Sequence, residues 1–119
     1  MIDNMTQLFE LQAAICKTLS DPNRLRILHE LREGELSVSE IVSRLGLPQG
    51  NVSHHLGLLR ERGIVLTRRE GTTIYYRLAD ERIAAACDLV RDVLQRSLTR
   101  GQELADTLEA IEKNSKRGS

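Results

Sequence analysis

A run of polar side chains after Pro48 has the chemistry to recognise the edges of nucleic-acid bases. The run contains Gln49, Asn51, Ser53 and His54. Carboxamides such as Gln49 and Asn51 can form two hydrogen bonds to adenine, whereas serine and histidine are less selective partners. If the segment begins a helix that lies in the major groove, these residues would face the base edges. They are the first candidate binding site.

Cys16 and Cys87 are the only cysteines among the 119 residues. Two cysteines cannot build a disulfide framework, which predicts a reducing, cytoplasmic location. If the thiols come together, they could bind arsenite or another thiophilic ion, or be bridged by an oxidant or reactive sulfur. Alternatively both are small apolar residues of the core, because free cysteine is among the most buried residue types.

The three histidines do not predict a metal site, and no other pattern predicts catalysis. His54 and His55 are neighbours, so on a helix they point about 100° apart and cannot hold one ion together. We expect a DNA contact for His54 and surface or packing roles for His29 and His55. The sequence has no glycine-rich phosphate loop and no nucleophile with a base in suitable geometry. We therefore predict no enzyme activity, no metal and no cofactor.

Apolar residues at three- and four-residue spacing predict five helices. The first covers Thr6 to Leu19 with Thr6 as N-cap, and the second begins at Pro22 after an Asp21 cap and ends at Gly34. The third begins with a Ser37/Glu40 capping box and stops at Gly46, and the fourth follows Pro48 and ends at Gly63. The last begins after Asp80, and Thr99-Arg100-Gly101 offers it a break or bend.

A β-hairpin is predicted directly after the two short helices. Residues 64–69 and 72–78 are rich in β-branched and aromatic side chains, with a Glu70-Gly71 turn between them. The order α-α-α-α-β-β-α indicates a mainly α winged helix-turn-helix. We expect a single domain over 1–119. Its parts are a helix-turn-helix at 38–63, a wing hairpin at 64–79, dimerisation helices at 1–20 and 80–113, and a flexible tail at 114–119.

Charge is distributed unevenly along the chain. The 17 basic and 17 acidic residues cancel, yet residues 44–77 hold six arginines and two acids, a net charge of +4, which leaves −4 for the rest. Local positive charge is what phosphate binding requires. Arg60, Arg68, Arg69 and Thr72 are the predicted contacts to phosphates or the minor groove. A solvated basic surface is the alternative that charge alone leaves open.

Four motifs in order resemble the arsenical-repressor (ArsR/SmtB) family of bacterial regulators. They are Asp21 to Leu28, Glu35 to Ile41, Asn51 to Leu56, and Arg69-Glu70-Gly71 continuing to Tyr75-Tyr76. The resemblance covers roughly residues 8 to 95. It implies a winged-helix homodimer that represses transcription by occupying an operator and leaves it when an inducer binds. It also supports Ser53 and His54 as residues that face DNA.

The family's known metal sites are not matched by this sequence. Ser37 and Ser39 stand where the third-helix site has cysteines, and hydroxyls are poor ligands for soft metals. On the last helix Asp80 is present, but Arg82, Val93 and Arg96 occupy the other ligand positions of the family's zinc site. Cys16 and Cys87 therefore remain the candidate sensor.

The predicted function is a cytoplasmic, dimeric repressor that binds double-stranded operator DNA and no membrane. Its inducer would be thiophilic or oxidising and would act at Cys16 and Cys87. Two alternatives stay open. One is a winged helix that binds a protein, and the other is a regulator of this kind with no metal or thiol effector.

Overall fold

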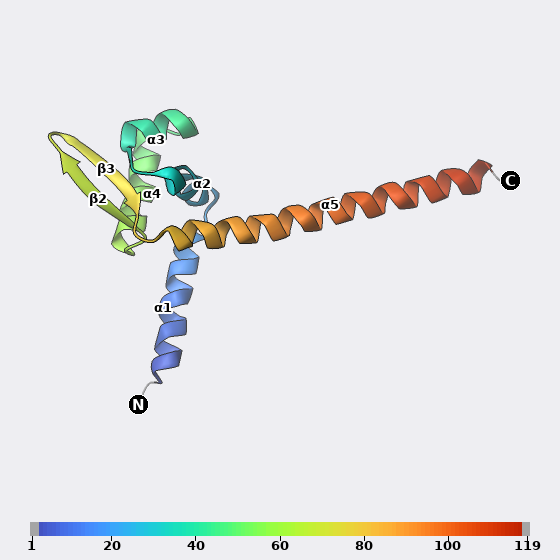
Figure 1. Ribbon diagram of the computed structural model, residues 1–119, viewed down its shortest axis with the longest axis horizontal. Coiled ribbons are helices and arrows are strands. Elements are labelled where there is room, and N and C mark those ends of the chain that lie inside the picture. The colour runs from blue at the N-terminus through green and yellow to red at the C-terminus, as the bar shows by residue number, and fades with distance from the viewer. Residues whose placement is uncertain (1–2, 118–119) are drawn as a thin grey trace. The chain divides into compact units, whose positions relative to one another are not determined.

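The computed structural model describes residues 3–117, which fold as seven longer elements, a 3₁₀ turn and a short strand (Figure 1). In chain order they are α1 (Asn4–Leu19), α2 (Pro22–Glu30), η1 (Leu31–Glu33), β1 (Leu36–Ser37), α3 (Val38–Leu45), α4 (Gln49–Glu61), β2 (Val65–Glu70), β3 (Thr73–Leu78) and α5 (Glu81–Arg117). The chain forms two compact units, one ending at Ala84 and one beginning at Ala85.

The core of the first unit is aliphatic. It is built by α2, α3, α4 and the sheet. Its largest fully buried side chains are Ile27, Leu28, Leu31, Ile41, Val52, Leu56, Leu59, Ile64 and Val65. Tyr76 packs on this core from β3. The predicted spacing of apolar residues is what brings these side chains to one side of each helix.

Helix boundaries follow the capping residues. Asp21 accepts backbone N–H bonds from Asn23 and Arg24, and Ser37 forms both halves of a capping box with Glu40, as predicted. The prediction that Thr6 caps the first helix is wrong. The Asp3 carboxylate caps α1 by accepting from the Met5 N–H, and the helix therefore starts at Asn4.

The sheet has three antiparallel strands in the order β1-β3-β2. Strands β2 and β3 form the predicted hairpin, whose turn contains Gly71 at φ +61°. The sequence did not predict β1, in which Leu36 pairs with Tyr76 and Ser37 pairs with Tyr75. This short strand ties the start of α3 to the hairpin and so fixes the wing to the helix-turn-helix.

The last helix is continuous, contrary to the expected break at Thr99-Arg100-Gly101. It also extends to Arg117, past residue 113 where it was expected to end, so residues 114–117 are helical rather than a tail. Ser119 and Gly118, the remainder of that predicted tail, lie outside the described residues. A glycine lowers helix stability by about 1 kcal/mol relative to alanine, which a long helix tolerates.

Candidate nucleic-acid interface

Helix α4 is anchored by its apolar face. Gly46 takes the left-handed conformation (φ +66°) that ends α3, and Pro48 then begins α4 without a side-chain hydrogen bond. Val52, Leu56 and Leu59 are 0% exposed. These three side chains fix how α4 is rotated about its own axis, and therefore which residues it presents to solvent.

The polar residues predicted to read bases lie outside the buried stripe of α4. Gln49, Asn51, Ser53 and His54 are all exposed. They occupy the first turns of the helix, where Pro48 supplies a backbone carbonyl for the Asn51 and Val52 N–H groups. At about 100° per residue, His54 lies nearly opposite the buried Val52, and Asn51 and Ser53 lie on the two flanks. The N-terminal residues of a helix are the ones that contact base edges when it enters the major groove.

His55 belongs to the interior side of α4. Its side chain is 12% exposed, and its Nδ1 accepts a hydrogen bond from Arg24 Nε at 3.2 Å. Arg24 also donates to the carbonyl oxygen of Thr18, at the end of α1, at 2.7 Å. His55 Nε2 lies 4.0 Å from Asp21 Oδ1, whose pKa is lowered mainly by the hydrogen bond from the Arg24 backbone N–H. This cluster joins α1, α2 and α4.

Replacing Arg24 by methionine is expected to destabilise the fold by about 1–3 kcal/mol, because the Thr18 carbonyl and His55 Nδ1 would lose their shared donor. Thermal unfolding should show a lower melting temperature for Arg24→Met than for the control variant Arg62→Ala. Arg62 is an exposed arginine at the end of α4. Equal melting temperatures for the two variants would mean that the cluster contributes nothing to stability.

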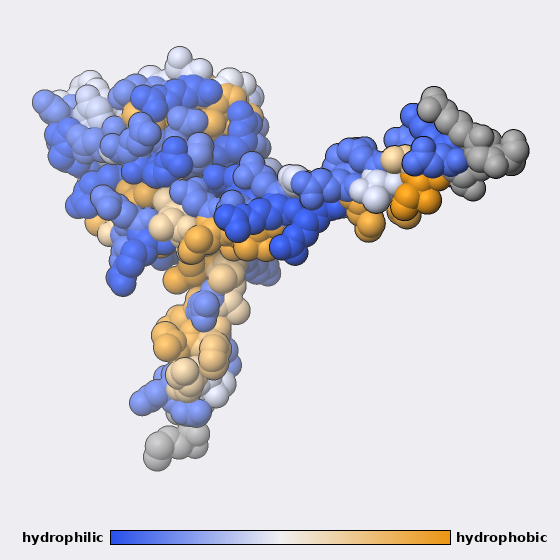
Figure 2. Space-filling view, turned by 45° about the vertical axis from the view of Figure 1, so that its right-hand side comes forward, coloured by the Kyte–Doolittle hydropathy of each residue, from blue (hydrophilic) through white to orange (hydrophobic). Residues whose placement is uncertain are grey.

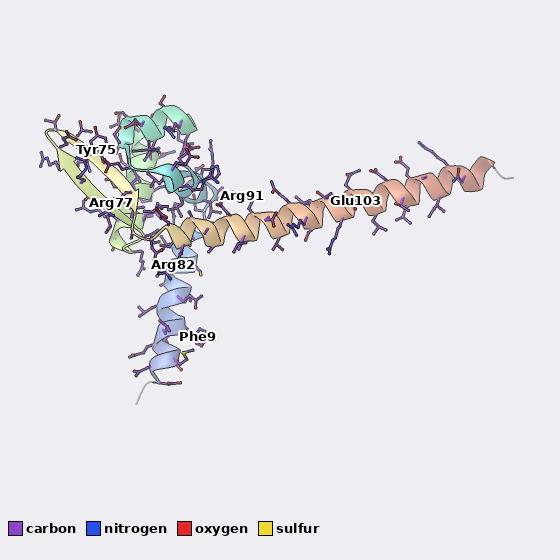
Figure 3. All side chains as sticks on the ribbon, viewed as in Figure 1. Phe9, Tyr75, Arg77, Arg82, Arg91 and Glu103 are labelled. Carbon is purple, nitrogen blue, oxygen red and sulfur yellow. The ribbon has the colours of Figure 1, made fainter. Side chains whose placement is uncertain are left out.

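The wing presents two arginines with different surroundings. Arg68 forms ion pairs with Glu35 and Glu70, at 3.2 Å from Nε to Glu35 Oε2 and 3.0 Å from Nη1 to Glu70 Oε2. Its guanidinium also lies 4.7 Å from the centre of the Tyr75 ring (Tyr75 is labelled in Figure 3). These hydrogen bonds raise the pKa of Arg68 and lower that of Glu35, so both stay charged at neutral pH. The charge of Arg68 is therefore largely balanced within the chain.

Arg69 points to the other face of the hairpin, because neighbouring residues of a strand alternate. It is exposed, and its Nε donates to the Gly71 carbonyl oxygen at 3.1 Å. Within residues 3–117 no carboxylate pairs with it. Thr72 is exposed beside it at the turn, and Arg60 is exposed near the end of α4. Glu35 was not among the residues that the sequence singled out. Its carboxylate pairs with Arg68 and not with Arg69, so the charge of Arg68 is balanced and that of Arg69 is not.

The candidate sensor cysteines lie in different units. Cys16 is an exposed residue of α1, and Cys87 is half-buried on α5. Neither is in a disulfide. The exposure of Cys16 does not fit the expectation of a buried apolar residue, at least within one chain. Their approach to each other stays a prediction.

The described residues contain no group of three or more histidine, cysteine, aspartate or glutamate side chains that could hold a metal ion. No helix in residues 3–117 is long and apolar enough to cross a membrane.

An aliphatic core that carries a solvent-facing α4 and a basic β2–β3 hairpin defines a winged helix-turn-helix protein. The model of the arsR family of bacterial regulatory proteins matches residues 21–67. The HTH-type transcriptional regulator Rv0081 of Mycobacterium tuberculosis is 42% identical over 77% of this chain and 82% of its own length. The chain therefore belongs to the arsR family and is a transcriptional regulator.

Solved structures of family members have the same fold. The homodimeric winged helix-turn-helix domain of Mb0332 from Mycobacterium bovis superposes with a TM-score of 0.74 at 35% identity, over 84% of this chain and 93% of that one. The transcriptional repressor BigR from Xylella fastidiosa gives a TM-score of 0.68 at 39% identity, over 76% of this chain and 92% of that one. The predicted fold class is confirmed.

Proposed function

We propose that this chain is a repressor that binds double-stranded operator DNA as a homodimer in the bacterial cytoplasm. The observation that carries the proposal is the exposure of four polar side chains at the start of α4, a helix held in the core by three fully buried residues. The four are Gln49, Asn51, Ser53 and His54. A helix fixed in this way can present hydrogen-bonding groups to base edges in a defined register. The first amides of α4 have no side-chain cap, which leaves them available to water or to a phosphate.

The wing supplies the phosphate contacts in this proposal. Arg69 and Thr72 at the hairpin turn would lie along the backbone or minor groove beside the major-groove site, and Arg60 would contact a phosphate near the end of α4. Arg68 would contribute less than Arg69, because Glu35 and Glu70 already balance its charge. Its ion pairs and the Tyr75 contact suit a role in holding the hairpin.

The homodimer would be formed through α1 and α5. Helix α1 exposes Met5, Leu8, Phe9, Leu11 and Ile15, and α5 exposes a longer apolar series. Figure 2 shows hydrophobic, orange surface over much of α1 and separate orange patches on the mostly hydrophilic surface of α5, and Phe9 is labelled on α1 in Figure 3. Exposed apolar surface of this extent is typical of protein interfaces. A two-fold dimer would place one α4 on each half of a palindromic operator.

A gel shift against the DNA upstream of the chain's own gene, at two salt concentrations, tests the proposed function. Specific retention that persists in the presence of competitor DNA supports a repressor. A winged helix used for protein contact would show no specific retention at either salt concentration.

Replacing Arg69 by alanine is expected to weaken binding to all DNA sequences and to reduce the slope of log K against log salt by about 1, the loss of roughly one phosphate contact. Arg82→Ala is the matched control, because Arg82 is an exposed arginine outside the wing that pairs with Asp80. An unchanged slope in Arg69→Ala would show that the wing does not lie on the phosphates.

The inducer would be a thiophilic ion, an oxidant or reactive sulfur that acts at Cys16 and Cys87. The exposed thiol of Cys16 supports access by such an agent. Operator binding by the reduced protein is expected to fall on addition of arsenite, an oxidant or a persulfide donor. A Cys16→Ser/Cys87→Ser variant should keep its DNA affinity and lose the response. If that variant responds like the parent to every agent, including zinc as the comparison ion, neither cysteine is the sensor.

A further inference from the structure

The two faces of the β2–β3 hairpin differ in charge. Neighbouring residues of each strand alternate between the faces, and residues that are paired in the register share one face. One face carries Arg68, Glu70 and Arg77. Glu35 pairs with Arg68 on this face, so its charges balance. The other face carries Arg69 without a carboxylate partner in residues 3–117, and it is therefore the face whose charge attracts a phosphate backbone.

Burial along the Arg69 face decreases toward the turn of the hairpin. Val65 and Leu78, at the open end of the hairpin, are 0% and 8% exposed and belong to the core. Near the turn, Arg69 is exposed and its cross-strand partner Ile74 is 39% exposed. The tip of the hairpin projects past the neighbouring helices α3 and α4 (Figure 1). Arg69 and Ile74 thus form an uncovered pair at the end of a face that begins in the core.

This face lies on the side of the sheet where α4 packs. Val65 belongs to the same core cluster as Val52 and Leu56 of α4. The uncovered end of the face therefore continues beyond the helices on their own side of the sheet, next to where DNA bound by α4 would run. Ile74 is not among the side chains that pack on the core. Its burial against a bound molecule would be favourable by transfer free energy.

An apolar side chain beside an unpaired arginine suits the minor groove of DNA. Arginine favours the narrow minor groove of A·T-rich DNA, where the potential is most negative. Isoleucine is among the apolar residues that minor-groove proteins place against the bases. The floor of the groove has only acceptors at A·T pairs, whereas a G·C pair adds the guanine 2-amino donor. Ile74 cannot accept a hydrogen bond, so an amino group beneath it would lose water without gaining a partner.

We propose that Ile74 is a specificity-determining residue of the wing, which disfavours guanine in the minor groove beside each site that α4 binds. Arg69 holds the hairpin on the phosphates, and Ile74 makes the contact that distinguishes A·T from G·C pairs. The inference rests on the proposed operator binding and adds a sequence preference at base pairs outside the reach of α4. Because α4 would read the major groove, changes confined to the minor groove separate the two contributions.

Inosine substitution isolates this contact. Inosine is guanosine without its 2-amino group, so an I·C pair keeps the major-groove pattern of G·C and lacks the minor-groove donor. Hydroxyl-radical footprinting on the DNA upstream of the chain's own gene locates the base pairs that the full-length protein protects beside each half-site. These pairs are then made A·T, G·C or I·C, and fluorescence anisotropy measures each affinity. We expect A·T and I·C flanks to bind alike and G·C flanks to bind about fivefold or more weakly.

Variants of the hairpin assign the preference to a residue. Ile74→Ala is expected to bind the three DNAs with similar affinities, because alanine does not reach the floor of the groove. Leu66→Ala is the matched control, since Leu66 is also 39% exposed but lies on the opposite face of the same hairpin, and it should keep the preference of the parent. Ile74→Thr is a second variant that retains a β-branched side chain and strand propensity. Its hydroxyl can accept from the guanine amino group, so it should lose the preference as well.

Several outcomes would overturn the assignment. If I·C flanks bind as weakly as G·C flanks, the discrimination does not occur in the minor groove. If both Ile74 variants keep the preference, another residue produces it, and if Leu66→Ala loses it, the stability of the hairpin produces it. A parent protein that binds its DNA without any flank preference would contradict the role of Ile74 and leave the proposed function standing. A parent protein that retains no DNA specifically would contradict the proposed function, and this inference with it.

Discussion

Replacing Asn51 by alanine is expected to weaken operator binding by about 1–3 kcal/mol, which corresponds to roughly tenfold to more than hundredfold in affinity. Asn51 is exposed in the first turns of α4, beside the fully buried Val52. Its carboxamide can donate to and accept from one adenine, so its removal leaves a base edge in the groove without partners. Binding to unrelated DNA should change little, because phosphate contacts carry that affinity.

Ser53→Ala and His54→Ala are expected to lose operator affinity in the same direction as Asn51→Ala, with smaller effects, because serine and histidine are less selective readers of bases. Gln95→Ala is the matched control, since Gln95 is an exposed amide on α5 and not part of the helix-turn-helix. Fluorescence anisotropy with operator and with scrambled DNA measures both affinities. Equal losses on the two DNAs for Asn51→Ala would assign Asn51 to the backbone instead of the bases.

Local sequence signals predicted most of the fold, because the forces that set helix ends act over a few residues. The Asp21 cap, the Ser37/Glu40 capping box and the Gly46 stop all lie within one turn of the boundaries that they define. The Thr6 cap was wrong for the same reason. Asp3 competes for the same role a few residues earlier, and a carboxylate is at least as good an N-cap as a hydroxyl.

Contacts between distant residues could not be predicted from one sequence. Arg24 and His55 are 31 positions apart, and Arg68 and Glu35 are 33 positions apart. Neither pair has a periodic signature, because each depends on how separate elements pack. The two-residue strand β1 is likewise too short to show alternation and exists because β3 offers it a partner. The exposure of the candidate base-reading residues of α4 was predictable, because it depends only on the spacing of three buried residues within the same helix.

The predicted break at Gly101 shows how a local preference is outweighed. Glycine disfavours helix, but the residues on both sides of it in α5 are good helix formers, so the preference of one position does not end the helix. Gly101 therefore lies in the middle of a continuous helix and marks no boundary. The tail predicted from residue 114 onward rested on polar composition. Residues 114–117 are nevertheless helical, because polar composition alone does not end a helix.

Replacing Leu56 by alanine is expected to destabilise the fold by about 2–5 kcal/mol, the range found for fully buried leucines. Leu56 is 0% exposed in α4, between Val52 and Leu59 in the core. Small domains unfold with a total of about 5–15 kcal/mol, so this loss is a large fraction of the stability. It should lower the midpoint of chemical denaturation, and operator binding should fall with the folded fraction instead of through a lost contact.

Leu66→Ala separates this packing effect from a general effect of leucine removal. Leu66 is 39% exposed on β2, so its truncation removes less buried surface and leaves no enclosed cavity. Its destabilisation should be well below that of Leu56→Ala. If the two variants had equal denaturation midpoints, α4 would not be held by the buried anchor, and the fixed rotation of its base-reading face would lose its physical basis. If Leu56→Ala stayed fully folded yet lost operator binding, Leu56 would act by positioning α4 more than by stabilising the domain.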